Sequence, residues 1–277
     1  MKIKYLGTAA AEGWPGLFCS CEHCKRARLA GGRNLRSRSQ ALIDEALLID
    51  FPPDTYLHVL YQGLNLAHVT HCLITHDHSD HLYPADFALR FGVFAHMEET
   101  KCLIIHATRP AYQKIGPYLE RQSETCEMRA SAHLVTPFVP FKAESYDIVP
   151  LKAEHAPACE PVFYLISKDG RTLLYAHDTG YFPDETWHWL AEEAPHLDLI
   201  SLDCTTLQID CREGHMGLEA CFDVKKRLLN EQLADEQSVF VINHFSHNGG
   251  LIHDELVPVA EKYGFVAAYD GLELEIL

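Results

Sequence analysis

The chain has 277 residues, 47% of them hydrophobic and 22% charged, which is an ordinary composition for a soluble globular protein. Its apolar runs are far shorter than the ~20 residues of a membrane helix, so no membrane partner is expected. The formal net charge of −16 argues against long nucleic acid and anionic membranes as partners, but not against a small anionic substrate bound beside metal ions.

The cysteines and the first residues of the chain indicate the cellular compartment. Residues 1–7 alternate like a strand and contain no apolar stretch of the kind found in signal peptides. Without such a signal, the ten cysteines are expected to be reduced, either buried or bound to metal, and a cytoplasmic location is predicted. The sequence does not define the oligomeric state, and a homodimer is one option.

The first half of the chain alternates predicted strands and helices. A hairpin is expected around Asp44 and Glu45, between strands at 41–43 and 47–49. Asp80 and His81 are expected to open a helix. The other expected strands are 2–6, 72–74 and 102–105, and the expected helices are a short basic one ending near residue 30, then 53–61, 83–96 and 109–121.

The second half begins with a weak pattern over 122–144. The Asp169-Gly170 dipeptide predicts a hairpin between 162–167 and 172–175, because this pair of residues favours tight turns. A final hairpin, about Asp270 and Gly271, is expected over 265–277. The remaining expected strands are 148–153, 197–202 and 239–242, and the remaining expected helices are 184–193, 218–233 and 254–263.

This order of elements predicts the fold class. Strands recur with helices between them in both halves, which favours two mixed sheets packed face to face with helices outside, rather than one doubly wound sheet. No Pro-, Gly- or Ser-rich linker divides the chain, so residues 1–277 are predicted to form a single α/β domain.

The most informative stretch is the run His76-Asp77-His78-Ser79-Asp80-His81, which directly follows the strand at 72–74. In an extended turn, His76 and His78 point the same way because side chains alternate. Asp80 and His81 come after the bend and can face a second ion. Imidazole and carboxylate are ligands that zinc and similar divalent metals prefer, so the run predicts two adjacent metals, with a polar surface loop as the alternative.

Four further candidates stand near the ends of predicted elements: His155, Asp178, His215 and His244. His155, Asp178 and His244 follow strands, and His215 precedes a long helix. Ligands placed by a rigid sheet can hold the geometry that a metal site needs. His177 is expected to be structural, because its side chain should point away from that of its neighbour Asp178.

The order H-x-H-x-D-H, then a His, an Asp and a late His, resembles the metallo-β-lactamase superfamily. The resemblance implies an αββα sandwich with two ions at its active site. Asp50, at the end of an early strand, would match the superfamily's first motif, an acid that orients a ligand. By this resemblance, one ion would be held by His76, His78 and His155, the other by Asp80, His81 and His244, and Asp178 would bridge them.

A second cluster consists of Cys19, Cys21 and Cys24. Three thiols within six residues predict a structural zinc that lacks its fourth ligand. His247 and His23 are the two alternatives for that ligand. The cysteines could also be buried thiols without a metal. Farther along, Arg33, Arg36 and Arg38 form a basic cluster that is expected to be a solvated loop, with a phosphate contact as the alternative.

The C-x-C-x-x-C motif, together with Gly7-Thr8, Gly13, Pro15 and a late His-x-x-His, resembles the PhnP branch of the superfamily. These are phosphodiesterases associated with the carbon–phosphorus lyase pathway, which open cyclic phosphodiesters of ribose phosphates. The resemblance implies that the three cysteines and His247 bind a structural zinc. It also implies that His215 is the general acid.

The predicted function is therefore that of a metal-dependent phosphodiesterase acting on small cyclic or nucleotide-derived diesters. Two divalent ions, zinc or manganese, would share a hydroxide that attacks phosphorus, with His215 and Asp80 as candidate catalytic residues and His215 protonating the leaving alkoxide. One alternative is another hydrolase of this fold, PqqB-like or acting on thioesters or lactams. A second is a non-catalytic metal-binding module, although structural zinc sites are closed and this ligand set leaves a position open.

Overall fold

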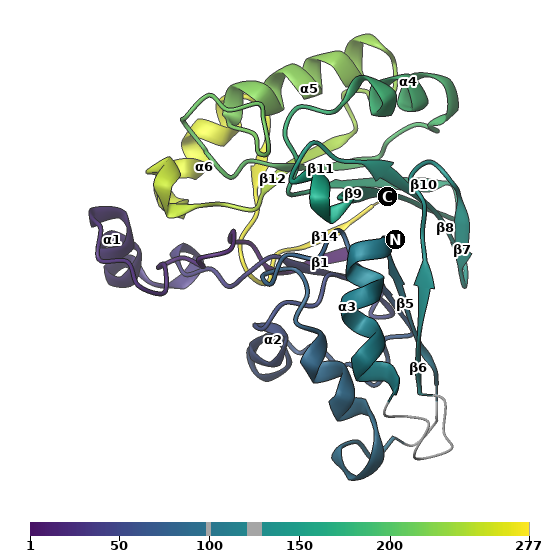
Figure 1. Cartoon of the computed structure of the whole chain (residues 1–277). Helices are drawn as coiled ribbons and strands as arrows, with labels where there is room; N and C mark the ends of the chain where they lie inside the picture. Colours follow the sequence, from purple (N-terminus) through teal and green to yellow (C-terminus); the bar gives the residue numbers. More distant parts are fainter. Residues whose placement is uncertain (98–100, 121–128, 277) are drawn as a thin grey trace.

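The computed structural model describes residues 1–97, 101–120 and 129–276, and these residues form two mixed β-sheets of seven strands each. We call them the N-terminal sheet, with the order β14-β1-β2-β3-β4-β5-β6, and the C-terminal sheet, with the order β13-β12-β11-β10-β9-β8-β7. They lie face to face with helices on both outer sides (Figure 1), which confirms the predicted αββα sandwich. The helices are α1 (Glu22–Ala30), α2 (Thr55–Tyr61), α3 (Arg109–Leu119), α4 (Asp184–Glu193), α5 (Leu218–Asn230) and α6 (His253–Lys262).

The N-terminal sheet is antiparallel at one edge and parallel at the other. β1 pairs antiparallel with β14 and β2, and β2 and β3 form the expected hairpin, while β3, β4, β5 and β6 run parallel. Its strands are β1 (Lys2–Gly7), β2 (Gln40–Ile43), β3 (Leu47–Ile49), β4 (His71–Leu73), β5 (Leu103–Ala107), β6 (Ala130–Leu134) and β14 (Glu273–Glu275).

The C-terminal sheet repeats this plan. β7, β8, β9 and β10 are antiparallel neighbours, including the predicted hairpin of β9 and β10, whereas β10, β11, β12 and β13 run parallel. The carboxyl ends of the parallel strands therefore meet at one edge. Its strands are β7 (Phe141–Ala143), β8 (Tyr146–Lys152), β9 (Val162–Lys168), β10 (Arg171–Ala176), β11 (Leu199–Asp203), β12 (Val239–Asn243) and β13 (Val266–Ala267).

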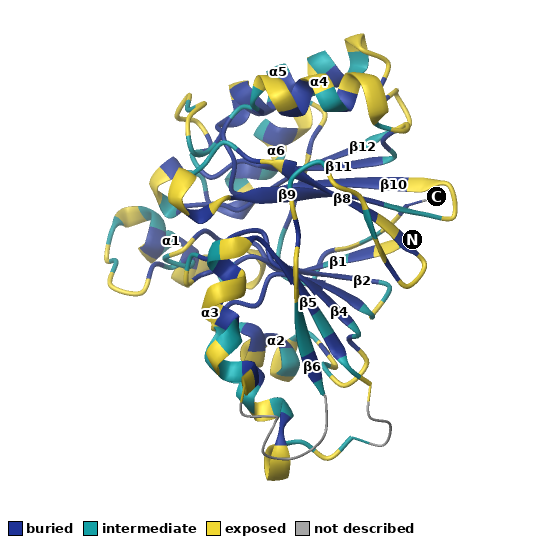
Figure 2. Cartoon of the chain, turned by 45° about the vertical axis from the view of Figure 1, so that its right-hand side comes forward, coloured by how far each residue is buried: buried dark blue, intermediate teal, exposed yellow. Residues whose placement is uncertain are grey.

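Alternation of side chains along the strands of the N-terminal sheet divides the core in two. Leu47 and Ile49 of β3 belong to the larger cluster, which includes residues of both sheets, whereas Leu48 belongs to a smaller cluster shared with Ala111 and Ile115 of α3. Figure 2 shows the buried strands between the helices, whose outer surfaces are exposed. Full burial of one such aliphatic side chain stabilises the fold by about 1.5–3 kcal/mol. No helix formed by the described residues is long and apolar enough to cross a membrane.

The predicted hairpin over 265–277 is wrong. β13 pairs with β12 in the C-terminal sheet, and β14 pairs with β1 in the N-terminal sheet, so the chain crosses between the sheets at Asp270. The Asp270 carboxylate accepts hydrogen bonds from the Thr8 hydroxyl at 2.6 Å and from the Ser37 backbone N–H at 2.6 Å. These contacts anchor the turn to the N-terminal loops, a tertiary effect that a turn dipeptide does not reveal.

The stretch after the histidine run also differs from prediction. Asp80 and His81 lie in a turn, and the helix expected over 83–96 is replaced by two 3₁₀ segments, Pro84–Arg90 and Gly92–Phe94. Phe91, in an extended conformation, separates the segments, and Gly92, with φ of 61°, begins the second one. The weak pattern over 122–144 contains β6 and β7, which were not predicted. Residues 121–128, including the expected end of the third helix at Arg121, lie outside the described residues.

Candidate metal centre

The histidine run reaches the C-terminal sheet through its backbone. It leaves β4 after Leu73, and its Thr75 carbonyl accepts a hydrogen bond from the N–H of Val162 in β9 at 3.0 Å. The Tyr164 hydroxyl of β9 donates to the Ile74 carbonyl at 2.8 Å, so the run is fixed between the two sheets. This placement brings the histidines to the edge where the carboxyl ends of β10, β11 and β12 meet.

The first group of potential ligands contains His76, His78, His155 and Asp178, each offering one ligand atom within 4.8 Å of the others. His76 Nε2 lies 2.9 Å from His78 Nδ1, and His155 Nε2 lies 3.2 Å from the same His78 nitrogen. The predicted alternation therefore places His76 and His78 on the same side of the run, and the structure brings His155 to them from beyond the end of β8.

The second group contains Asp80, His81, Asp178 and His244, all buried and again within 4.8 Å of one another. His81 Nε2 lies 3.2 Å from Asp80 Oδ2 and 3.2 Å from His244 Nε2. Asp80 thus stands among the potential ligands. A separate catalytic role for this residue stays a prediction.

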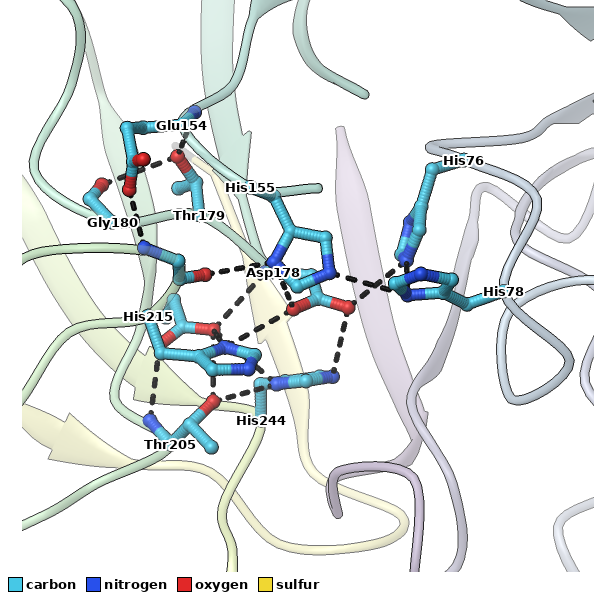
Figure 3. A network of polar contacts seen from close by, with 12 residues as sticks. His76, His78, Glu154, His155, Asp178, Thr179, Gly180, Thr205, His215 and His244 are labelled. Carbon is cyan, nitrogen blue, oxygen red and sulfur yellow. Dashed lines mark hydrogen bonds and ion pairs between the residues drawn. The ribbon is translucent and has the colours of Figure 1, made fainter. Parts of the chain in front are cut away.

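Asp178 belongs to both groups. Its Oδ2 lies 3.1 Å from His76 Nε2 and 3.0 Å from His81 Nε2. Figure 3 shows its carboxylate between the imidazoles of His76 and His78 and those of His215 and His244. Its Oδ1 is buried and has no partner with hydrogen-bond geometry among the described residues. Asp178 therefore stands where a carboxylate that bridges two ions would stand.

Three strand-end residues of the site have left-handed backbones. The φ angles are 65° for Asp50, 54° for Asp178 and 63° for His244, which residues other than glycine seldom adopt. Such conformations persist when the surrounding structure fixes them, and they are concentrated at functional sites. Here they turn the chain sharply at the ends of β3, β10 and β12.

The outer ring nitrogens of the histidines are held by oxygen atoms. His81 Nδ1 lies 2.7 Å from Asp50 Oδ2, which places Asp50 where its predicted orienting role requires it. His155 Nδ1 lies 2.9 Å from the Gly214 carbonyl, and His244 Nδ1 lies 2.8 Å from Thr205 Oγ1. An oxygen partner on one ring nitrogen fixes the tautomer and directs the other nitrogen toward a metal.

Charge and burial also fit a divalent metal. Burial and the neighbouring His81 lower the pKa of His76 to about 4, which keeps its ring neutral and able to bind a metal. Although burial opposes it, the surrounding histidines hold the pKa of Asp178 well below its usual value, so the carboxylate is ionised. His81 differs: although burial opposes it, the carboxylates of Asp80 and Asp50 hold its pKa well above its usual value, so a metal at His81 would have to displace a proton. Imidazoles gathered around an ionised, buried carboxylate match the donor set of a dinuclear centre.

His215 lies beside the two groups at the edge of a cavity of about 400 Å³. Its Nδ1 is 3.1 Å from Asp178 Oδ1 and 3.4 Å from Asp203 Oδ2, and its side chain is 31% exposed. Burial alone would lower its pKa, but the two carboxylates raise the pKa to about 9, so the ring holds a proton near neutral pH. The residues that line this cavity are Ala10, Ala11, Glu12, His78, Asp80, His155, Asp178, Thr205, Thr206, Ile209, His215, His244, Ser246 and Asn248.

Asp203 was not predicted as a site residue. It ends β11, is fully buried, and accepts hydrogen bonds from the backbone N–H groups of Asp178, Thr205 and Met216 at 2.9–3.1 Å. Its Oδ2 lies 3.3 Å from His244 Nδ1. Its position in the sequence could have marked it as a site residue, because an acid at the end of a predicted buried strand lies at the same edge of the sheet as Asp178 and His244. His177, predicted to be structural, lies within the core with Nε2 2.6 Å from Ser201 Oγ.

The structure also gathers Cys19, Cys21, Cys24 and His247 into one group with ligand atoms within 4.8 Å. His247 Nδ1 lies 3.5 Å from Cys21 Sγ and 3.8 Å from Cys19 Sγ. Burial opposes ionisation of Cys21, but hydrogen bonds, first from the Cys24 backbone N–H, lower its thiol pKa to about 6. Four donors of this kind fit a closed, tetrahedral zinc site.

His23, the alternative fourth ligand, and the nearby arginine cluster have partners other than the thiols. His23 Nδ1 lies 2.8 Å from Arg26 Nη2, so its ring is directed to the helix and not to the thiols. The arginine cluster is only partly solvated: Arg33 is exposed as expected, but Arg36 is buried and donates to Thr8 Oγ1 and the Ala268 carbonyl at 2.7 Å. Arg38 pairs with Asp54 at 3.1 Å.

Comparison with solved structures shows the same fold in several proteins. A new diphosphatase from the PhnP family has a TM-score of 0.72 at 20% identity, covering 99% of this chain and 97% of that one. Zn²⁺-bound PqqB from Methylobacterium extorquens has a TM-score of 0.75 at 19% identity, covering 99% and 100%. The short form of human tRNase Z has a TM-score of 0.67 at 15% identity, covering 100% of both chains.

Sequence comparison identifies the family. No curated protein matches the chain significantly. The model of the β-lactamase superfamily domain, however, matches residues 47–234, a span that runs from β3 to the end of α5 and contains all the potential ligands of the two His/Asp groups except His244. Because this match covers more than half of the chain, the protein belongs to the β-lactamase superfamily and has the fold of its metal-dependent hydrolases.

Proposed function

We propose that this protein is a metal-dependent phosphodiesterase that hydrolyses small cyclic or nucleotide-derived phosphodiesters. The observation that carries the proposal is the position of Asp178, shared by two groups of potential ligands and lying 3.1 Å from the imidazole of His215. One structural neighbour is a diphosphatase by name, which supports phosphate chemistry on this fold. Two divalent ions, zinc or manganese, would activate water as a nucleophile and neutralise charge on the phosphoryl oxygens.

The proposed site separates metal binding from proton donation. His76, His78 and His155 would hold one ion, Asp80, His81 and His244 the other, and Asp178 both. His215 is fixed at Nδ1 by Asp178 and Asp203, which leaves Nε2 as the nitrogen able to deliver a proton to the leaving oxygen. An alkoxide leaves slowly unless it is protonated, and such proton transfer typically contributes ~10²–10⁴-fold.

The cavity limits the size of the substrate. Its volume of about 400 Å³ is at the lower end of the range for small-molecule sites, so a nucleoside-sized diester fits better than a long nucleic acid. The acidic net charge of −16 supports the same preference, because a nucleic-acid-binding surface needs basic residues along the phosphate backbone.

The test is a metal count and a substrate panel. The purified protein should contain close to three metal ions per chain, two in the His/Asp groups and one with the thiols. It should hydrolyse bis(p-nitrophenyl) phosphate and cyclic nucleotides faster than a lactam or a thioester. Two bound metals in the His/Asp groups without hydrolysis of any diester would contradict the proposal and favour a binding module. Preferential hydrolysis of the lactam or the thioester would favour another hydrolase of this fold.

A further inference from the structure

One acidic side chain in the cavity wall is not among the potential metal ligands. Glu12 lies in the loop after β1, and its side chain is 31% exposed. Of the lining residues, Glu12, Asp80 and Asp178 are acidic and none is lysine or arginine. Asp80 and Asp178 face the potential metal positions, so their charges would be compensated there. Glu12 belongs to none of the potential ligand groups, so its charge would not be compensated in this way.

The position of Glu12 is fixed by the segment that follows β12. The hydroxyl of Ser246 donates to Glu12 Oε1, and the buried Ser246 in turn donates its N–H to the Thr205 carbonyl at 3.1 Å. His247 Nε2 lies 3.6 Å from the same Glu12 oxygen. Oε2 makes no hydrogen bond or ion pair with any residue that the structure describes, so it is left for solvent or a ligand.

The neighbouring arginine does not cancel this charge. Arg38 contacts the lining segment by donating from Nε to the Ala11 carbonyl at 2.7 Å. Its guanidinium, however, pairs with Asp54 at 3.1 Å. The described part of the cavity therefore contains no lysine or arginine for a second phosphate group, and His215, which also lines it, is already paired with Asp178 and Asp203.

We propose that Glu12 determines substrate specificity: it excludes phosphodiesters that carry a second phosphate and favours diester monoanions with neutral, hydroxyl-bearing substituents. This inference rests on the proposed function and narrows its substrate class. The reacting diester carries one negative charge, which the metal positions accommodate. A terminal phosphate would bring about two more charges close to Glu12, whereas a sugar hydroxyl could donate a hydrogen bond to Oε2.

The test compares two substrates that differ only in a terminal phosphate. Adenosine 2′,3′-cyclic phosphate and the same compound with a 5′-phosphate are hydrolysed by the wild-type protein and by Glu12→Gln, which keeps an oxygen for Ser246. We expect the wild type to prefer the first compound. Glu12→Gln should raise the relative kcat/KM for the second about five- to tenfold, because it removes the repulsion between one carboxylate and a phosphate with about two charges. Glu12→Lys should raise it further.

Two controls separate this effect from a general change in charge. Glu236→Gln removes the same charge from an exposed position outside the cavity. It should leave the ratio of the kcat/KM values for the two substrates unchanged. The gain in Glu12→Gln should shrink at 0.5 M salt, where charges are screened within a few ångströms. The inhibition constants of adenosine 3′-phosphate and adenosine 3′,5′-bisphosphate, measured for the wild type and for Glu12→Gln, compare one and two phosphate groups without turnover.

The outcomes distinguish this inference from the proposed function. If the wild type hydrolyses bis(p-nitrophenyl) phosphate but Glu12→Gln and Glu12→Lys leave the ratio within twofold of the wild type, the specificity role of Glu12 is refuted and the phosphodiesterase stands. If the metal-loaded wild type hydrolyses no diester at all, the proposed function itself is refuted.

Discussion

The two metal-ligand clusters of this protein are assembled in different ways. The His/Asp cluster combines the run after β4 with residues beyond the ends of β8, β10 and β12, so both sheets contribute to it. In the cysteine cluster, three of the four donors lie between residues 19 and 24, and Cys21 is also the N-cap of α1, accepting a hydrogen bond from the Cys24 N–H. The first cluster depends on the whole fold, whereas the second is largely local.

The clusters also differ in their surroundings. The His/Asp cluster opens onto a cavity and has His215 beside it as a proton donor, as a reacting site needs. The cysteine cluster also borders a hollow, lined in part by Cys19 and His247, but its four donors can close a tetrahedral site by themselves, which fits a structural role. His244 and His247 connect the two through one short segment after β12. The difference predicts that changes in the first cluster affect chemistry, while changes in the second affect stability.

The largest expected effect is that of His78→Ala. His78 Nδ1 faces both His76 and His155, so its loss removes the centre of the first ligand group. We expect activity on bis(p-nitrophenyl) phosphate to fall at least about 10³-fold, since loss of a residue that merely orients a ligand already costs 10- to 100-fold. The protein should remain folded at the assay temperature, as should His188→Ala, a control change at an exposed position on α4. Activity of normal size in His78→Ala would contradict the metal centre.

The next effect separates the metal ligands from the proton donor. His215→Ala should leave the metal content intact while slowing reactions that need a protonated leaving group. We expect a loss of about 10²-fold or more with a cyclic nucleotide and less than tenfold with bis(p-nitrophenyl) phosphate, because nitrophenolate leaves without a proton. Equal losses on both substrates would remove His215 from the acid role.

A smaller effect is expected at the cysteine cluster. Cys21→Ser removes the thiol that lies 3.5 Å from His247 and should reduce the metal content by one ion per chain. The free energy of unfolding should fall by about 3 kcal/mol, the contribution of an ion present at a few hundred times its dissociation constant. Part of the activity should remain. Cys211→Ser, at a cysteine outside the cluster, is the matched control. Full loss of activity with unchanged stability would reverse the roles assigned to the two clusters.

The same contrast explains how much could be predicted from the sequence. The strands before His76, Asp178 and His244 were predicted because their apolar residues are continuous and the polar residues follow directly. The positions of His155 and Asp178 beside His76 depend on pairing between distant strands, and only the resemblance to a known family placed them in one cluster. Asp203 and Thr205 were missed because their role is to hold other residues, which leaves no spacing pattern of its own.

The errors in the fold prediction have a similar cause. The turn at Asp270 was identified correctly, but the partners of β13 and β14 are set by contacts of the Asp270 carboxylate with Thr8 and Ser37, more than 230 positions away in the chain. Likewise, Glu12, the acid of the cavity wall, lies in the loop whose Gly13 and Pro15 contribute to the family resemblance, but no pattern in the sequence indicated a role for Glu12 itself. Its position becomes meaningful only beside Ser246.

The smallest expected effect concerns a histidine outside both clusters. Its measurement tests whether a buried imidazole remains neutral without a metal. His58 of α2 is fully buried, with Nδ1 2.6 Å from Gln40 Oε1 and Nε2 2.8 Å from Ser37 Oγ. Burial lowers its pKa from 6.5 to about 4. Between these values the unfolded chain binds a proton that the folded protein does not, so stability falls as the pH falls through this window.

This shift implies a loss of about 2 kcal/mol from His58 between pH 7 and pH 5. Urea unfolding at pH 7, 6 and 5 measures it. His58→Gln should be less stable at pH 7, because glutamine cannot reproduce both ring contacts, but its stability should depend less on pH than that of the wild type. His188→Gln, at an exposed position, should keep the wild-type slope. If the free energy of unfolding of His58→Gln depends on pH as steeply as that of the wild type, His58 is protonated in the folded protein. Burial alone would then not keep an imidazole neutral. The imidazoles of the His/Asp cluster would need bound metals to stay unprotonated.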